Sequence, residues 1–437
     1  MNFSDYVKVL LLDSIRNLAA DPTKYACNPG RDFSRNRKLR FKRFLLMFLS
    51  MEADSIKEEL YRYFGRSTST PFKAAFYKQR QKLRQDALPF LLLEFNKKCK
   101  QKLWNGRFSL VACDGSAVDI FRNPHDTDTF FEPNGKSARG FNQIHINSLY
   151  SILDKKFLDL IVQPARKRSE YSAFCQLVDR ADSLNPALYI CDRGYASYNT
   201  FAHVIENGQF FLIRCTDAKT ERLLGFSLDT VKALDYRVDR ILSRSKSTKK
   251  RLHPEYSDQY RYICPDVPMD YISDGCPEYH MSLRVIRFQL PGGSFENLIT
   301  NPPDQEFSLE DFMELYHLRW NQETAYRNLK YPLCLKAFHS KKYEYIVQEV
   351  WARAILHNFC MEIATHVDIP RKDTKHVYQI NYSEAIKICR DHLRIHDGVT
   401  VIDVEGLIAQ NIEPVRAGRT FARQARFKLP ISFCYRH

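Results

Sequence analysis

The sequence predicts an α/β protein with a mixed β-sheet, flanking helices, a β-rich insertion and a helical N-terminal segment. Three stretches support this prediction. Residues 1–100 look helical and basic, residues 108–215 alternate apolar strands with helices, and residues 216–290 contain short strands between proline-containing turns. Because strands in a hairpin come first and strands joined by crossover helices follow, one sheet is expected to hold antiparallel and parallel pairs.

Length and composition fit a globular protein with two or three domains. The chain has 437 residues, of which 44% are hydrophobic. The longest apolar run, residues 44–51, is much shorter than the roughly 20 residues that span a bilayer. The N-terminus carries acids early and is typical of an amphipathic helix rather than a signal peptide. We therefore expect a soluble, non-secreted protein with no membrane partner.

Cysteine spacing and net charge limit the possible classes of protein further. The 12 cysteines are scattered and include no C-x2-C pair, which favours reduced, buried thiols over a metal site or disulfides. The formal net charge of +15 indicates a polyanionic partner, most often nucleic acid. Charge alone is weak support for this, because many basic proteins bind no nucleic acid.

The first 100 residues contain a candidate DNA-binding module. Residues 31–43 hold seven cations and one acid. Asp54 is placed to cap a helix that Gly65 ends, and Thr70 and Pro71 are placed to begin the next. Two short helices with a tight polar link are typical of a helix-turn-helix, whose second helix would carry Lys73, Lys78, Arg80, Lys82 and Arg84. An ordinary helical hairpin with a solvated basic face explains the pattern equally well.

The following stretch provides the sheet. A strand is predicted at 108–120, and a hairpin of two strands at 141–164. A helix at 168–184, a strand at 187–192, a helix at 195–208 that ends at Gly208 and a last strand at 209–216 follow. The β-rich insertion then contains a basic loop at 244–251. Ser308 is the expected N-cap of one helix that continues to Pro332. A further helix follows within 343–367, and a basic segment lies at 416–429.

Two aspartates occupy comparable places, Asp114 in VACDGS and Asp192 in YICDRG. Each ends an apolar run where a strand is expected to give way to a glycine-containing turn. Ligands of open α/β sheets bind at strand ends, and a carboxylate there needs a positive partner such as a divalent cation. A turn in which the aspartate accepts bonds from nearby amides explains either residue alone equally well. Two such positions together favour the metal interpretation.

The segment YHLRWNQETAYRNLK supplies a third carboxylate. At about 100° per residue, Arg327 shares one helix face with four other polar residues: Tyr316, Arg319, Glu323 and Lys330. A solvated face with an ion pair from Glu323 to an arginine is the simpler alternative. If this face points at the two aspartates, Glu323 completes a two-metal Mg²⁺ site and the flanking donors bind phosphates.

These residues resemble a known family. The pattern Tyr-x2-Arg-x3-Glu-x6-Lys is similar to the signature of bacterial insertion-sequence transposases of the family named for insertion sequence four. CDGS and CDRGY resemble the two catalytic-aspartate motifs of that family, and residues 140–164 resemble the segment between them. The resemblance covers about residues 105–360. It implies a DDE transposase with a ribonuclease-H-like catalytic core and an insertion between the second aspartate and the glutamate.

The resemblance also implies roles for individual residues. The expected catalytic and metal-binding triad is Asp114, Asp192 and Glu323, with two Mg²⁺ ions that Mn²⁺ can replace. The residues expected to contact transposon-end DNA are Tyr316, Arg319 and Lys330, with Arg327 on the same face. Arg193, beside the second aspartate, either contacts DNA or pairs with an acid. The family is thought to process ends through hairpins, but no motif here identifies an aromatic that would hold a flipped base.

The leading hypothesis is a DNA transposase that binds terminal inverted repeats, cleaves DNA strands and transfers them into target DNA. The expected domains are a DNA-binding domain at 1–100, a catalytic domain at 101–360 and a C-terminal region at 361–437 for dimerisation or DNA contact. A homodimeric synaptic complex and a place at the bacterial nucleoid in the cytoplasm follow from the family. The alternatives are a domesticated relative that binds DNA without cleavage and a plain nuclease. Intact carboxylates argue against the first, and the basic N-terminal helices against the second.

Overall fold

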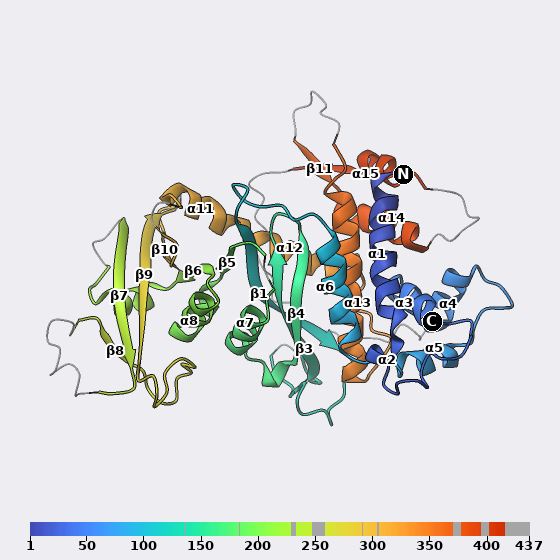
Figure 1. Ribbon diagram of the computed structural model, residues 1–437, viewed down its shortest axis with the longest axis horizontal. Helices are drawn as coiled ribbons and strands as arrows, with labels where there is room; N and C mark the ends of the chain where they lie inside the picture. The colour runs from blue at the N-terminus through green and yellow to red at the C-terminus, as the bar shows by residue number, and fades with distance from the viewer. Residues whose placement is uncertain are drawn as a thin grey trace.

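The computed structural model describes these residues of the chain: 1–135, 137–182, 184–228, 233–246, 258–290, 292–303, 306–369, 377–394 and 402–415. They form one large mixed sheet with helices on its faces and a group of helices beside it (Figure 1). The expected α/β class is confirmed. The basic segment 416–429 and part of the basic loop 244–251 lie outside the described residues. No helix in the described part of the chain combines the length and apolar character that crossing a membrane requires.

Five strands form the part of the sheet that carries the predicted aspartates. In spatial order they are β4 (Lys156–Pro164), β3 (Phe141–Ser151), β1 (Ser109–Ile120), β5 (Ala187–Cys191) and β6 (Phe210–Cys215). β3 is antiparallel to both of its neighbours, whereas β1, β5 and β6 run parallel. The short strand β2 (Phe130–Phe131) pairs with the start of β3. The predicted hairpin and the mixed character of the sheet are therefore both present.

The segment after β6 extends this same sheet. It contains α9 (Asp217–Leu224), β7 (Leu234–Ser243), β8 (Tyr260–Tyr262), β9 (Glu278–Gln289) and β10 (Phe295–Thr300). From β6 the sheet continues in the order β10, β9, β7, β8, and β10 runs antiparallel to β6. β10 lies beyond the expected end of the insertion at residue 290. The added strands thus share hydrogen bonds with the central sheet.

The sheet is the middle of three layers. α7 (Glu170–Asp179) and α8 (Tyr198–Glu206) share a core with one face of β1, β5 and β6, including Val111 and Tyr189. α11 (Leu309–Leu318) shares a core with the opposite face, including Leu110 and Ile190. Neighbouring residues of one strand serve different layers because successive side chains of a strand point to opposite faces.

The N-terminal helices pack around one central helix. They are α1 (Phe3–Ala20), α2 (Pro22–Tyr25), α3 (Phe41–Leu49), α4 (Ile56–Phe64), α5 (Lys73–Arg80) and α6 (Ala87–Lys98). Most of them share a core with α12 (Trp320–Lys330), α13 (Tyr343–Ala364) and α14 (Tyr382–Arg394). α13 is buried on almost every side and crosses residue 360. Figure 1 shows α1, α6, α13 and α14 side by side.

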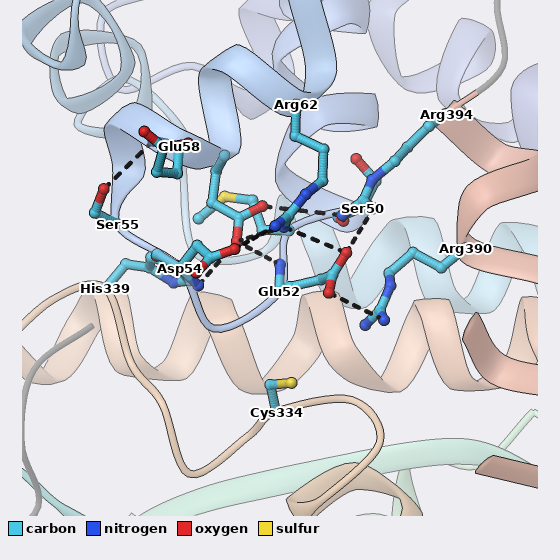
Figure 2. Close-up of polar contacts among 12 residues, drawn as sticks. Ser50, Glu52, Asp54, Ser55, Glu58, Arg62, Cys334, His339, Arg390 and Arg394 are labelled. Atoms are coloured by element: carbon cyan, nitrogen blue, oxygen red, sulfur yellow. Dashed lines mark hydrogen bonds and ion pairs between the residues drawn. The ribbon is translucent and has the colours of Figure 1, made fainter. Parts of the chain in front are cut away.

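The C-terminal elements are tied to the N-terminal ones by polar contacts. Figure 2 shows Glu52, whose Oε1 lies 2.6 Å from Arg394 Nη1 and whose Oε2 lies 3.3 Å from Arg390 Nη2 of α14. Burial raises the pKa of Glu52, but these arginines outweigh it and the net pKa is lowered. The helix α15 (Val404–Gln410) provides Glu405, which accepts hydrogen bonds from Ser4 N at 2.7 Å and Ser4 Oγ at 2.9 Å. The strands β11 (Tyr378–Ile380) and β12 (Ile412–Pro414) form a separate small sheet.

The helix pair α4–α5 differs in detail from the expected helix-turn-helix. Ser55 rather than Asp54 caps α4, because its side chain reaches the amide of the first turn. Gly65 ends α4 in the left-handed conformation, with φ +73°, as expected. α5 begins at Lys73 rather than at Thr70.

Arg80 was expected on an exposed basic face but is buried. Its Nη1 lies 2.9 Å from Glu349 Oε1 of α13, and the two side chains are 1% and 3% exposed. The Arg80 guanidinium also lies 5.0 Å from the ring centre of Tyr345. Arg80 therefore anchors α5 to α13 and is not available to DNA.

Candidate active site

The two aspartates start from adjacent points of neighbouring strands. Cys113 of β1 pairs with Cys191 of β5 in parallel register, and each aspartate is the next residue. Because paired strands lie about 4.8 Å apart, Asp114 and Asp192 lie beside each other. Asp192 is the N-cap residue of the short 3-10 helix Arg193–Tyr195. The two motifs therefore lie next to each other at the end of β5.

The expected strand 108–120 is confirmed as β1, but the glycine-containing turn expected directly after Asp114 was wrong. β1 continues to Ile120. Beyond Cys113 it stays paired with β3 but is no longer paired with β5. Gly115 therefore lies within the strand. Glycine fits at this position, because a Cβ there would collide with His145 Nε2 of β3. The glycine of CDGS thus allows close packing and does not form a turn.

Burial is the largest influence on the pKa of Asp114. It raises the pKa of this carboxyl from 3.8 to about 6. The Gly115 amide, whose N donates to Asp114 Oδ1 at 2.8 Å, and the Arg319 guanidinium act against burial. The negative charges of Glu323 and Glu170 act with it. The pKa of Asp114 is therefore lowered by one cationic side chain and raised by two further carboxylates.

The signature residues lie on two helices and not on the single helix that was expected. α11 ends at Leu318 and α12 begins at Trp320. At the junction, Arg319 N donates to Tyr316 O at 3.3 Å and Gln322 N donates to Arg319 O at 3.1 Å. These tighter, three-residue bonds bend the chain. The bend has a tertiary cause, since α11 packs on the apolar face of β5 and β6, whereas α12 packs with β1, β3 and α13.

Buried hydrogen bonds hold α12 on the sheet. The Tyr326 hydroxyl donates to the Asp114 carbonyl oxygen at 2.8 Å and lies 2.8 Å from Ser148 Oγ. Gln322 Nε2 donates to Ser148 O at 2.9 Å. Glu323 lies between these two anchors in the sequence and is half-buried. α12 thereby places the Glu323 carboxylate near Asp114.

The flanking donors extend from both helices toward the strands. The Tyr316 hydroxyl donates to Asp192 Oδ1 at 3.4 Å. Lys330 Nζ donates to Ser116 Oγ at 2.7 Å, two residues after Asp114 on β1. Two other predicted DNA contacts, Arg193 and Arg327, are exposed.

The charges of all three carboxylates affect the pKa of Arg319. Burial lowers the pKa of its guanidinium, but the Tyr316 hydroxyl and then Asp192, Asp114 and Glu323 outweigh it, and the net pKa is raised. The guanidinium is 4.9 Å from the ring centre of Trp320, and its Nε has no hydrogen-bond partner among the described residues. The three carboxylates therefore act on one buried cation from three separate elements.

Sequence reasoning missed a further acidic group beside these residues. Glu170, the first residue of α7, has Oε1 3.0 Å from Nε2 of the buried His145. The only sequence sign of it was a serine followed by a glutamate at the start of a helix, which ordinary capping explains.

The three carboxylates are the kind of ligand that a hard divalent cation prefers, although they are widely spaced in this structure. Across the described ranges, no three acidic, histidine or cysteine side chains lie close enough together to hold a metal ion. The residues at hand offer carboxylate oxygens, which Mg²⁺ and Mn²⁺ prefer. Their combined negative charge already attracts a cationic guanidinium. The residues fit such an ion by donor type and charge.

A mixed sheet with carboxylates on two adjacent parallel strands and on a following helix is the arrangement that the resemblance to DDE transposases implies. The sequence model of one family, the transposase DDE domain, matches residues 106–359, and this chain belongs to that family. It is a DDE transposase, and enzymes of this family act on DNA with divalent metal ions.

The chain is similar to a piggyBac transposase solved by cryo-electron microscopy as a synaptic complex with hairpin DNA. The TM-score is 0.45 at 9% sequence identity, over 94% of this chain and 84% of that chain. No curated protein matches the sequence.

Proposed function

We propose that this transposase belongs to the family named for insertion sequence four. In this proposal it binds the terminal inverted repeats of its own element, cleaves the strands there and joins them to target DNA. The observation that carries the proposal is geometric: Asp114 and Asp192 follow paired residues of β1 and β5, and α12, which carries Glu323, is held on the Asp114 carbonyl, while the charges of all three raise the pKa of the buried Arg319. A purely structural ion pair needs one carboxylate for one guanidinium. Three carboxylates from β1, the end of β5 and α12 leave negative charge that divalent ions can use.

The residues that would hold the ions are the same three carboxylates. Two Mg²⁺ ions, or Mn²⁺ in their place, supply activation of the attacking oxygen and stabilisation of the leaving 3′-oxygen when bound. Arg319 and an ion compete for the same negative charges. We therefore propose that Arg319 turns to a DNA phosphate when the site is loaded, where its fork of donors suits two phosphate oxygens.

The remaining donors line the proposed DNA path. Tyr316 and Lys330 would exchange Asp192 and Ser116 for phosphate oxygens next to the cleaved bond, and they hold their present positions through hydrogen bonds. The exposed Arg193 and Arg327 would contact the backbone further away. The basic residues of the N-terminal helices would bind the inverted repeats, and two copies of the chain would meet in the synaptic complex. Action in the bacterial cytoplasm, at the nucleoid, is part of the same proposal.

The test is cleavage of DNA that carries the ends of the element. Wild-type protein should nick this DNA in Mg²⁺, and Glu323→Gln should abolish nicking while DNA binding persists. Glu314→Gln is the matched control, because Glu314 is an exposed glutamate of the neighbouring helix α11. Equal nicking by Glu323→Gln and wild type would refute the assigned triad. Tight binding by the wild type without any metal-dependent cleavage would favour the domesticated relative.

A further inference from the structure

We propose that a polar cleft beside α12 binds a backbone phosphate of DNA and that Lys155 is its cationic donor. The inference rests on the proposed function and adds to it a contact from residues that the sequence signature does not name. The cleft lies where α12, α13 and α14 meet the turn between β3 and β4. Its polar lining includes Lys155, Asn321, Thr324, Asn328 and Tyr382.

Lys155 is held in place without being neutralised. Its Nζ donates to the Tyr382 hydroxyl at 2.6 Å and lies 4.5 Å from the centre of the same ring. In the part of the chain that the structure describes, Lys155 forms no ion pair, whereas the next residue, Lys156, pairs with Glu362 at 2.8 Å. Lys155 also adopts φ +55°, a left-handed conformation that is uncommon for lysine. Such strain is typical of positions where function fixes the side chain.

The helix α12 contributes three further polar side chains to the cleft. Asn321, Thr324 and Asn328 are spaced three and four residues apart, so they share one face of the helix. Asn328 is 7% exposed, and neither its amide nor that of Asn321 forms a side-chain hydrogen bond to another described residue. Because a buried amide without a partner costs stability, these groups favour a polar ligand.

The side chains of the cleft select an anion. None of the described residues that line it is acidic. Lys155 carries a positive charge, and the two asparagine amides and the hydroxyls of Thr324 and Tyr382 can all donate hydrogen bonds. The cleft contains about 280 Å³ of space, part of it open to solvent, which admits a phosphate group. Phosphate oxygens accept from lysine, amide and hydroxyl donors alike.

The position of the cleft on α12 points to DNA as the source of the phosphate. At about 100° per residue, Arg327 lies about 40°, Thr324 about 100° and Asn328 about 140° around the helix from Glu323. Arg327 and Thr324 are exposed. A strand bound at Glu323 can therefore cross this exposed side of α12 and place a phosphate in the cleft. Free phosphate offers the same oxygens, so the experiment has to separate the two sources.

A simpler alternative is that Lys155 only ties the β3–β4 turn to α14. This explains its contact with Tyr382. It does not explain why Asn321 and Asn328 turn donors without described partners into the same cleft. A structural tie also predicts that loss of Lys155 lowers stability and leaves the affinity for DNA unchanged.

The experiment measures the affinity of the full chain for a duplex with the ends of the element by fluorescence anisotropy in EDTA. In a series of duplexes, one phosphate at a time is replaced by an uncharged methylphosphonate. One replacement should weaken binding of the wild type by about tenfold. Lys155→Asn should bind the unmodified duplex about tenfold more weakly and should be insensitive to that replacement. Lys155→Arg, which keeps the charge, should restore most of the affinity.

The choice of variants separates a lost contact from a damaged fold. Asparagine tolerates the left-handed conformation, so Lys155→Asn should unfold thermally near the wild type. Lys336→Asn is the matched control, because Lys336 Nζ donates to the Tyr331 hydroxyl at 3.0 Å and lies 4.3 Å from that ring on an exposed segment. It should bind as the wild type does, and an equal loss in both variants would refute a specific site. Should Lys155→Asn not fold, Asn328→Asp places a negative charge in the cleft, and unchanged binding by this variant overturns the inference.

The outcomes also separate this inference from the proposed function. If the wild type prefers end DNA but shares with Lys155→Asn the same sensitivity at every linkage, the phosphate site is refuted and the proposed function stands. If the wild type binds end DNA and an unrelated duplex alike, the proposed recognition of ends is refuted. Salt dependence on the unrelated duplex then tests the cleft, because phosphate contacts need no sequence. The slope of log K against log salt should be smaller by about 1 for Lys155→Asn, and an equal slope overturns the inference.

Calorimetric titration with inorganic phosphate tests the other source. Phosphate binding by the wild type but not by Lys155→Asn, with no sensitive linkage in the DNA, would assign the cleft to free phosphate and overturn the DNA contact. A sensitive linkage that depends on Lys155 supports the inference.

Discussion

Replacing Asp114 by asparagine should stabilise the metal-free protein at neutral pH while it removes a proposed ion ligand. Burial raises the pKa of Asp114 from 3.8 to about 6. The difference of about 2 units corresponds to about 3 kcal/mol. A carboxyl whose pKa is raised by folding holds its proton more tightly in the folded state. Its ionisation therefore costs no stability below about pH 4, costs progressively more between pH 4 and 6, and costs about 3 kcal/mol above that.

The assay is urea unfolding in the presence of EDTA at pH 4.5 and pH 8. The stability of Asp114→Asn relative to the wild type should rise between these values by about 2 kcal/mol, because about 1 kcal/mol of the cost is already present at pH 4.5. The control is Asp274→Asn, because Asp274 is exposed in the loop between β8 and β9. Its relative stability should stay nearly constant. A relative stability of Asp114→Asn that does not depend on pH would show that burial does not strain this carboxylate, and the reasoning would fail.

Three other changes test the packing around the site and the helices. Gly115→Ala should destabilise the fold by about 1–3 kcal/mol through the collision with His145, and truncating His145 to alanine should recover part of this in urea unfolding. Burial lowers the pKa of His357 to about 4, so the wild type loses about 3 kcal/mol of folding stability as the pH falls from 6.5 to 4. His357→Leu should therefore lose less stability over this pH range. Equal pH dependence of both proteins would contradict this. Glu405→Gln should cost about 1 kcal/mol in thermal unfolding, because its carboxylate accepts from Ser4 at the start of α1; no change would mean that this cap is dispensable.

Local sequence patterns predicted individual strands and helix ends well. The hairpin 141–164, the strand before Asp192 and the end of α4 at Gly65 all depend on signals within a few residues. Alternation, apolar runs and a left-handed glycine act over one element. For the same reason, the three carboxylates were found from sequence, since each lies in a short motif. Their catalytic role stays a prediction.

Errors arose where distant segments meet. The helix from Ser308 bends at Arg319 because its two halves pack into different cores, although its own sequence is helical throughout. Arg80 looked like a DNA contact because Glu349, its partner, is far away in the chain.

The sequence by itself determined which residues are candidates to bind metal and phosphate, because side-chain chemistry and the spacing of short motifs are local properties. Only the tertiary structure decided that β1 lies between β3 and β5, that His145 lies against Gly115, and that Glu170 lies beside His145. These facts depend on which strand lies beside which. Strand pairing and layer packing join residues far apart in the chain, and no local pattern carries that information.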